Sequence, residues 1–587
     1  CFAKKPSQNC PMADDANDEL SGLDVEVPDE THAPDAERSS RMSPGSTGGS
    51  AGSPGHRSSG SAGSSGHLES EETEENQEAQ EAPDLYDRMA ALLARMQPIG
   101  EDMVRGIAVR HVLHGFGAAL RLHPSQQEKT LRRLHQKSRP IDAVAEFWSH
   151  SWRGEAWQKI STLSLLKNGT AAAIIGTLAA CLGSALSFYG VLPLFGTAPL
   201  WGNIFGTCFF IPTILLWPSS QKIFLDVACI DQEDPKKKAK GILSLGATLK
   251  RSKKFLLLWD PSYDKRLWCI FELAAFVRCN PENNSRIRIM PIFLGTCAFS
   301  LFTWCLVCTA VSVGIQAASW NFDYENDEEY YEKYYFGIAM YYVFISVWFV
   351  SFTYIACMMF RKHFRSIASF QERLLRFQLA EAECYCCSAG HVDTGDLCDR
   401  EVIARCIRAW FGSESEFEEV CRTVLGASIL RHLGPHLFPY KLYMVSSCPL
   451  LWGIFDHAVF HWLVLQTPRG AVHYLMVGFA NYMGLGLLIL SILCFIARCC
   501  WRPLRYKCVD HVLNVVAAIF LYVVFFATVG FIQVLYFLTN NDHTAENLVV
   551  ACWSGITILL GHFCWFFPYL WRHKDGHRND LQPERRN

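Results

Sequence analysis

Four residues of the types that bind zinc gather in one short stretch of the sequence: Cys384, Cys387, His391 and Cys398. Three thiolates and one imidazole match the tetrahedral ligand set of structural zinc sites. The spacing therefore predicts a structural zinc ion that would clamp together the helices expected on either side of the stretch. Palmitoylation of Cys386 and Cys387, or ordinary free thiols, would explain the same cysteines.

Ionisable residues also interrupt stretches that are otherwise apolar. Asp456, His457 and His461 share one such stretch, with the two histidines one helical turn apart, and His562 lies in the middle of another. Charged groups are costly at the centre of a bilayer and usually face a partner or a cavity. These intramembrane polar residues predict either a proton or metal relay between helices, or neutral histidines that are hydrogen-bonded to Asp456 and tightly packed.

Ser149, His150 and Ser151 invite comparison with the serine hydrolases. A serine beside a histidine lacks the strand–turn–helix elbow that exposes a hydrolase nucleophile. The surrounding residues AEFWSHSW are typical of a β-strand, and a strand accounts for these side chains without hydrolysis.

The elements that must position these residues are apolar segments long enough to cross a bilayer. The chain of 587 residues is 50% hydrophobic and only 19% charged, whereas soluble domains average about 25% charged residues. Crossing the hydrocarbon core takes about 20 apolar residues. The sequence therefore predicts a mainly α-helical bundle of about eight transmembrane helices, with the lipid bilayer as partner. The eight runs lie at 169–189, 198–217, 291–314, 336–360, 447–466, 472–497, 511–538 and 547–570.

Basic residues are divided unequally between the two sets of connecting loops. Clusters of Lys and Arg follow the fourth, sixth and eighth apolar runs, whereas the loop at 190–197 has none and the loop at 321–335 is acidic. Loops rich in Lys and Arg face the cytoplasm in multi-pass proteins. Both chain termini and the two larger polar segments, 218–290 and 361–446, are therefore expected on the cytoplasmic side.

Composition defines the remaining segments. The N-terminal residues are rich in Ser, Gly and acidic side chains and have almost no apolar surface to bury, which predicts disorder. The net charge of −3 gives no indication of a nucleic-acid partner.

The domains expected are a disordered tail (1–84), a helical arm (85–140), a transmembrane hairpin (169–217), spans three and four (291–360), a cytoplasmic helical segment with the Cys/His cluster (361–446), spans five to eight (447–570) and a cytoplasmic tail (571–587).

Between these segments, short strands alternate with helices. The stretches IFLDV, FLLLW and RIRIMPIFL are apolar and β-rich, and helical patterns separate them at 238–249 and 268–277. A continuous apolar run such as FLLLW is typical of a buried parallel strand. Alternation of this kind predicts a small α/β domain with a parallel sheet, in two pieces at 141–168 and 218–297.

These two pieces resemble the Toll/interleukin-1 receptor (TIR) domain. The strand signature is AEFWSHSW, with Phe147 and Ser149, and the second strand with its loop is FLDVACIDQ. A helix leads to Ser252 and the FLLLW strand, and PSY and RLWCIFEL follow. The most specific match is an aromatic-Cys-x-x-Glu-Leu helix. Further matching residues are Asp226 and Asp231 in the loop, and Trp268, Cys269, Glu272 and Leu273 in that helix.

The resemblance implies a role for Glu272. In the TIR domains that cleave NAD, the glutamate of this helix is catalytic, so the resemblance points to Glu272 as catalytic and to NAD as substrate. A carboxylate there would hold the ribose and stabilise an oxocarbenium-like centre, as the carboxylates of glycosidases do. The alternative is that Glu272 caps the helix or pairs with Arg266 or Arg278. Many TIR domains are adaptors that act by assembling, so self-association is also expected.

The chain departs from the TIR pattern in one respect. The first strand is separated from the second by the two-span hairpin at 169–217. A hairpin returns to the side it left, so both pieces can still meet if residues 141–153 pair with the strand at 222–228. The strand RIRIMPIF runs almost directly into the third span, which predicts a sheet pressed against the bilayer.

The function expected from the sequence is that of a polytopic membrane protein with a cytoplasmic TIR-like signalling or scaffolding domain, whose activity would be NAD cleavage. The alternative is a membrane transporter or channel in which the spans carry the function and the cytoplasmic insert regulates it. No repeat symmetry or filter motif in the sequence supports transport.

Overall fold

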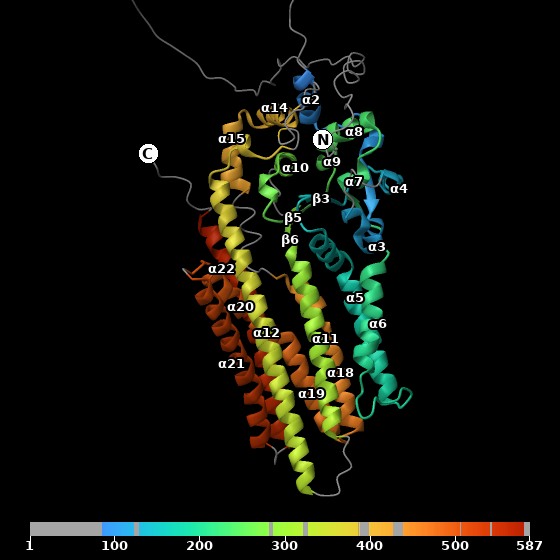
Figure 1. Cartoon of the computed structure of the whole chain (residues 1–587), viewed down its shortest axis with the longest axis vertical. Coiled ribbons are helices and arrows are strands. Elements are labelled where there is room, and N and C mark those ends of the chain that lie inside the picture. Colours follow the sequence, from blue (N-terminus) through green and yellow to red (C-terminus); the bar gives the residue numbers. More distant parts are fainter. Residues whose placement is uncertain are drawn as a thin grey trace, which may run out of the picture.

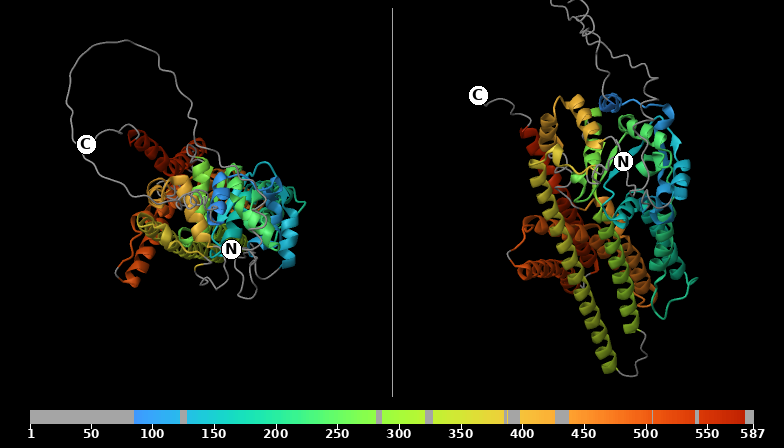
Figure 2. Two further views of the ribbon diagram at one scale, coloured as in Figure 1. Left: turned by 90° about the horizontal axis from the view of Figure 1, so that it is seen from above. Right: turned by 45° about the horizontal axis from the view of Figure 1, so that its top comes forward.

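A computed structural model describes residues 85–121, 128–280, 286–320, 327–384, 387, 398–425, 438–504, 506–539 and 543–579. The predicted tail at 1–84, His391 and the end of the predicted tail at 571–587 lie outside the described residues. Long helices run side by side along the longest axis, and a small α/β part lies at one end of them (Figure 1). The tilted view shows the same two parts, with the yellow-green helices leading away from the sheet (Figure 2).

Within the described ranges, six helices are long and apolar enough to cross a membrane, as expected for a multi-pass membrane protein. The eight-span count itself is not confirmed. The runs predicted at 198–217 and 447–466 form α6 (Trp201–Leu216) and α18 (Cys448–Leu463), each of 16 residues. A helix of that length extends about 24 Å at 1.5 Å per residue, which is less than the ~30 Å of the hydrocarbon core.

The six long segments match the other six predicted runs. Their exposed side chains include many large apolar residues, for example Val512, Phe520 and Val523 on α21, as a lipid-facing helix requires. The helices are α5 (Ala156–Phe188), α11 (Phe293–Trp320), α12 (Asp327–Leu375), α19 (Pro468–Ala480) continuing through the π-helical turn η6 (Asn481–Leu485) into α20 (Gly486–Cys499), α21 (Lys507–Thr539) and α22 (His543–Asn579).

One six-stranded sheet has the order β2-β1-β4-β3-β5-β6. Its four strands β4, β3, β5 and β6 are parallel. The predicted pairing of 141–153 with 222–228 is confirmed, because Glu146 pairs with Ile223 and Phe147 with Phe224. The strands are β1 (Arg105–Ala108), β2 (Arg139–Pro140), β3 (Glu146–His150), β4 (Lys222–Phe224), β5 (Phe255–Trp259) and β6 (Ile287–Pro291).

The segment expected to be a helical arm contributes strands as well. Helices α2 (Leu85–Arg95), α3 (Val109–Arg121) and α4 (Glu128–Lys137) form there, but β1 pairs antiparallel with β4 and with β2. A run as short as Arg105–Ala108 has too few residues for its periodicity to separate strand from helix. A glycine suits position 106 in β1, because a Cβ there would lie 2.3 Å from the Cδ1 atom of Ile141.

Aromatic packing holds the centre of the sheet. Every residue of β3 and of β5 is buried. The ring of Phe147 stacks on Phe224 at 4.7 Å between centroids and on Phe255 at 5.6 Å, so three neighbouring strands share one apolar contact. Around the sheet lie α7 (Asp226–Cys229), α8 (Pro235–Leu243), α9 (Leu245–Lys250) and α10 (Leu267–Cys279).

The carboxyl ends of the strands point toward the membrane helices (Figure 1). Helix α5 begins six residues after β3 ends, and α11 begins two residues after β6 ends. The hydroxyl of Thr162 on α5 donates to the carbonyl of Ile292 at 2.6 Å and accepts from the Gly295 N–H at 3.0 Å. The sheet therefore continues directly into two spans, of which the sequence predicted the one that follows β6.

The segment after α12 folds over the α/β part. It forms η4 (Leu379–Glu381), α14 (Asp399–Phe411) and α15 (Glu414–Val420), and α17 (Tyr440–Ser446) leads back to the bundle. The ring of Trp410 on α14 stacks on Phe271 of α10 at 5.3 Å. This segment thus covers the outer side of α10.

A buried guanidinium joins α12 to the start of α21. Arg361 is only 1% exposed and donates to the carbonyl of Cys500 at 2.8 Å and to the side chains of Asp510 and Asn514, both at 2.6 Å. Arg365 also donates to Asp510, at 2.7 Å. Removing one member of a buried charged pair is strongly destabilising, because the other member is left without its partner.

Arg361→Ala should lower the free energy of unfolding by about 3–5 kcal/mol, because it removes the donor to the Cys500 carbonyl and to the buried Asn514 side chain and leaves Asp510 with Arg365 alone. The measurement is the apparent melting temperature of the detergent-solubilised chain. Arg376→Ala, in the turn directly after the same helix, is the control. The Arg376 side chain is 80% exposed beside Glu372, and such surface pairs contribute about 0–1 kcal/mol. Equal melting temperatures for the two variants would contradict the prediction.

Candidate functional site

A cluster of polar side chains lies at the carboxyl end of the central strand. The Ser149 hydroxyl, on β3, donates to the Glu272 carboxylate at 2.5 Å, and it also lies 2.7 Å from the Tyr263 hydroxyl. Glu272 belongs to α10, and Tyr263 to the short turn η2 (Tyr263–Lys265) before it. The structure thus brings together two residues of the predicted signatures that lie 123 positions apart.

A second carboxylate belongs to the same cluster. Asp226 is the first residue of α7, directly after β4 and Leu225, and it accepts from the indole N–H of Trp152 at 3.0 Å. Its negative charge is one of the causes that raise the pKa of Glu272. The two carboxyl groups come from different crossovers of the sheet and act on one another through their charges.

The pKa of Glu272 is raised to about 8, chiefly by burial and also by the charge of Asp226, while the Ser149 hydrogen bond and the charge of Arg266 act in the opposite direction. Burial likewise raises the pKa of Asp226 above its usual range. A carboxyl with a pKa of about 8 is mostly neutral at pH 7. Perturbed carboxyl pairs of this kind are found preferentially at functional sites.

The position of the cluster in the sheet is the one that ligands occupy in doubly wound folds. Taken in chain order, the parallel strands lie in the order second, first, third, fourth, so the topology reverses between β3 and β5. Ligands of such folds bind beyond the carboxyl ends of the strands at this switch point. Ser149 lies near the end of β3, and Asp260 directly follows β5.

A membrane helix closes one side of this edge. Lys159, in the first turn of α5, is 1% exposed and donates to the Ser151 carbonyl at 2.8 Å. Ser151 lies 2.8 Å from Ser262, whose hydroxyl donates to Asp260 at 2.5 Å. The second carboxylate oxygen of Asp260 is buried without a hydrogen-bond partner among the described residues. This chain of hydroxyls connects the loops after β3 and β5.

The serine–histidine pair does not assemble as a hydrolase would require. The Nε2 atom of His150 is buried and has no hydrogen-bond partner among the described residues. Burial, followed by the charge of Lys159, lowers the pKa of His150 to about 3. Ser149 bonds to Glu272 and Tyr263, and Ser151 lies within hydrogen-bond distance of Ser262.

The alternative role predicted for Glu272 was pairing with an arginine, and no direct contact of this kind supports it. Across the described part of the chain, no ion pair joins Glu272 to Arg266 or to Arg278. The start of α10 is instead held by the segment after α12. Arg373 donates to Asp264 at 2.7 Å, and the N–H of Glu383 donates to the Lys265 carbonyl at 2.6 Å. Nothing in the sequence identified these contacts, because the partners lie more than a hundred positions apart.

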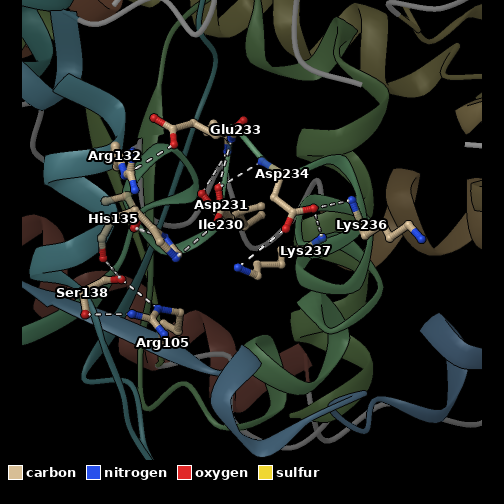
Figure 3. A network of polar contacts seen from close by, with 12 residues as sticks. Arg105, Arg132, His135, Ser138, Ile230, Asp231, Glu233, Asp234, Lys236 and Lys237 are labelled. Carbon is tan, nitrogen blue, oxygen red and sulfur yellow. Dashed lines mark hydrogen bonds and ion pairs between the residues drawn. The ribbon is translucent and has the colours of Figure 1, made fainter. Parts of the chain in front are cut away.

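Asp231, the other acidic residue of the FLDVACIDQ match, lies in a different hollow. A cavity of about 240 Å³ opens between α4 and the loop before α8, and no residue of the Glu272 cluster lines it. There Asp231 faces His135 at 3.9 Å, and Arg132 faces Glu233 at 3.8 Å (Figure 3). Asp234 beside it caps α8 by accepting from two backbone N–H groups. The charges in this cavity are mixed in sign and largely paired with one another.

The predicted zinc ligands are only partly described. The thiols of Cys387 and Cys398 lie 3.6 Å apart, and Cys384 is buried. All three raise the pKa of Arg400, the hydrogen bond with Cys387 contributing most. His391 lies outside the described residues, and within the described ranges no group of three or more metal-binding side chains is suitably placed. The zinc site stays a prediction.

Asp456 is completely buried and serves as a cap for α6. Its carboxylate accepts from the backbone N–H of Gly202 at 2.8 Å and of Asn203 at 2.9 Å. The Asn203 side chain donates at 2.8 Å and the Ser184 hydroxyl at 3.1 Å. The first N–H groups of a helix carry partial positive charge, so a carboxylate there is stabilised without a counterion. Sequence reasoning did not find this role.

The three histidines lie at two different places. His457 and His461 both pack against the ring of Tyr474, at 5.2 and 4.5 Å between centroids. His457 also lies 3.3 Å from the Ser312 hydroxyl, on α11. His562 lies elsewhere, 3.3 Å from the Tyr440 hydroxyl, with its other ring nitrogen 2.9 Å from the carbonyl of Ile558. Among the described residues, Asp456 bonds to Gly202, Asn203 and Ser184 rather than to a histidine, so the predicted Asp456–His hydrogen bond is not found there.

Comparisons with family models, with curated proteins and with solved structures return no match for this chain. The candidate site therefore rests on its own geometry.

Glu272→Gln should stabilise the protein in a pH-dependent way. The folded carboxyl keeps its proton up to about pH 8, whereas the unfolded carboxyl loses it near its ordinary pKa of about 4.3. Wild-type stability is therefore lost as pH rises between these values, and the variant is spared this loss. The gap in apparent melting temperature should widen from pH 5 to about 8 and then level off.

The matched control is Glu381→Gln, which changes an exposed carboxyl in the neighbouring turn η4. Its difference from wild type should stay constant across the same pH series. A constant gap for Glu272→Gln would instead mean that Glu272 ionises at the same pH in the folded and unfolded states.

Asp456→Asn should lower the free energy of unfolding by about 1–3 kcal/mol, since an amide N–H₂ would face backbone N–H donors at the start of α6. Ser491→Ala is the control, because that hydroxyl donates only to the Leu487 carbonyl of its own helix. Apparent melting temperatures of the reconstituted chains provide the measurement. Unchanged stability combined with altered ion flux in liposomes would favour the relay instead.

Proposed function

We propose that this multi-pass membrane protein carries a TIR-like signalling domain, and that the Glu272 cluster cleaves NAD between nicotinamide and ribose. The single observation that carries the proposal is the Ser149–Glu272 hydrogen bond of 2.5 Å at the switch point of the sheet. Both residues belong to the two sequence signatures that resemble TIR domains.

The arrangement of strands supports the proposal. A first strand, a second strand on one side of it and a third and fourth on the other make up the parallel part. Helix α10, with the aromatic-Cys-x-x-Glu-Leu pattern, follows β5 and the η2 turn. The hairpin at 169–217 leaves the sheet after β3 and returns before β4, so it interrupts the sequence of the domain without interrupting its hydrogen-bonded pairing.

The chemistry required of Glu272 agrees with its surroundings. Cleavage of the glycosidic bond develops positive charge on the ribose, which a nearby carboxylate stabilises. Glu272 is mostly neutral at pH 7, since its pKa is about 8. The positive charge of a bound nicotinamide ring would lower that pKa and favour the carboxylate form. The Ser149 hydroxyl would then orient one carboxylate oxygen.

The paired carboxylates also make the reaction pH-dependent. If the ionised Glu272 acts, cleavage at low NAD concentration should increase as pH rises toward about 8, where the carboxyl loses its proton.

The test uses the full chain in lipid nanodiscs with NAD, and nicotinamide release is followed by chromatography. Glu272→Ala should reduce release at least about 100-fold, which corresponds to about 2.7 kcal/mol of transition-state stabilisation. Ser149→Ala should reduce it less, since it removes only the residue that orients the carboxylate. Glu381→Ala, on the exposed η4 turn, should leave the rate unchanged.

Intact NAD in the presence of wild-type protein, both dispersed and concentrated enough to self-associate, would overturn the enzymatic part of the proposal. Self-association measured by light scattering on the same samples would then support the scaffolding role. Release that persists in Glu272→Ala would place the reaction elsewhere.

A further inference from the structure

Two exposed thiols lie at the same boundary of the bundle. Cys499 is the last residue of α20, and Cys508 is the second residue of α21. Both are exposed, whereas Cys500 between them is half-buried. The chain leaves one span and enters the next between these positions, so the two thiols lie at one end of two antiparallel membrane helices.

The backbone that carries these thiols is held in place. Arg361 donates to the Cys500 carbonyl at 2.8 Å, and Arg365 donates to the Trp501 carbonyl at 2.6 Å. Both arginines project from α12 and both pair with Asp510. The α20–α21 connection is thereby fixed against a third span, and the thiols keep a constant depth relative to the helices.

The surroundings of the thiols are those of a membrane surface. Exposed apolar side chains lie beside them in sequence, among them Phe495 at 67% and Val512 at 58% exposure. Exposed basic side chains flank them: Arg498, Arg502 and Lys507. Basic residues at the end of a span mark the cytoplasmic, anionic face of a bilayer, and exposed apolar side chains offer the surface on which a hydrocarbon chain would lie.

We propose that Cys499 and Cys508 are sites of S-acylation by long-chain fatty acyl groups. The thiolate sulfur attacks the carbonyl carbon of a long-chain acyl-coenzyme A. The new carbon–sulfur bond forms as the bond to the coenzyme A sulfur breaks, and the cysteine proton ends on the released coenzyme A thiol. No oxidant is needed. Cysteines beside a span are the residues at which reversible acylation occurs.

Position distinguishes this pair from the other exposed cysteines among the described residues. Cys181 and Cys208 lie within α5 and α6, away from the ends of these helices. Cys552 lies near the start of α22, the helix that follows the end of α21. It therefore lies toward the opposite boundary of the bundle. Of the five exposed cysteines in the described ranges, Cys499 and Cys508 are therefore the two that a transferase working at the basic face can reach.

Acylation there would act on α12 as well as on the connection itself. The acyl chains would insert beside α20 and α21 and anchor the loop that Arg361 and Arg365 hold. The same helix carries Arg373, which pairs with Asp264 before α10. The modification would thus fix to the bilayer the cytoplasmic end of the span that leads to the candidate site.

The test expresses the full chain in cultured eukaryotic cells. Free thiols are blocked with N-ethylmaleimide, thioesters are cleaved with neutral hydroxylamine, and the released thiols are tagged with maleimide–polyethylene glycol. Wild type should show two hydroxylamine-dependent mobility steps that are missing from Cys499→Ser/Cys508→Ser. Each single variant should lose one step, and Cys552→Ser, the matched control at the opposite boundary, should lose none.

Intact-mass spectrometry of the purified wild-type chain should show the mass of the attached acyl groups, and the double variant should lack it. The proposal is overturned if the double variant keeps every hydroxylamine-dependent step, or if wild type shows none and its intact mass is that of the bare chain. Neither result depends on NAD cleavage, so the outcome leaves the proposed function to its own test.

Discussion

The hydroxyl of Thr162 bridges two membrane helices at the point where the sheet ends. It donates to the Ile292 carbonyl and accepts from the Gly295 N–H, in a place where water could not easily satisfy either group. A Cβ on residue 295 would lie 2.1 Å from the Thr162 backbone nitrogen, so only glycine permits this approach. The bond sets α5 and α11 side by side, and these helices continue from β3 and β6.

This junction determines the surroundings of the Glu272 cluster. Because the strands run into the spans, their carboxyl ends face the bundle, and the first turn of α5 packs over them with the buried Lys159. Burial raises the pKa of both Glu272 and Asp226, while the charge of Lys159 lowers that of Asp226. The first turn of α5 therefore contributes to the electrostatics of the site through its buried ammonium group.

Helix α12 connects the same site to the remainder of the bundle. In its last third, Arg361 reaches the connection between α20 and α21, and close to its end Arg373 reaches Asp264 before α10. The aromatic ring of Trp259 on β5 packs against Phe370 between these two points. A single continuous helix thus contacts the lipid-embedded region and the turn that leads to Glu272, and any displacement of one end is transmitted along it.

Local patterns in the sequence were enough for the long spans and for the parallel strands. A span needs about 20 apolar residues, and a buried strand needs a short apolar run. Both patterns can be recognised in consecutive residues of the sequence. The same reading overestimated 198–217 and 447–466, because an apolar run does not show where its helix begins and ends. It also missed β1, whose four residues acquire their strand conformation only by pairing with β4.

The Ser149–Glu272 contact, the capping of α6 by Asp456 and the Arg361 network were decided by the tertiary structure. Each joins residues more than a hundred positions apart. The amino-acid sequence by itself determined which residues were available to make them. Hydrogen bonds and burial act through space, so their partners become defined only after the strands and spans have packed together.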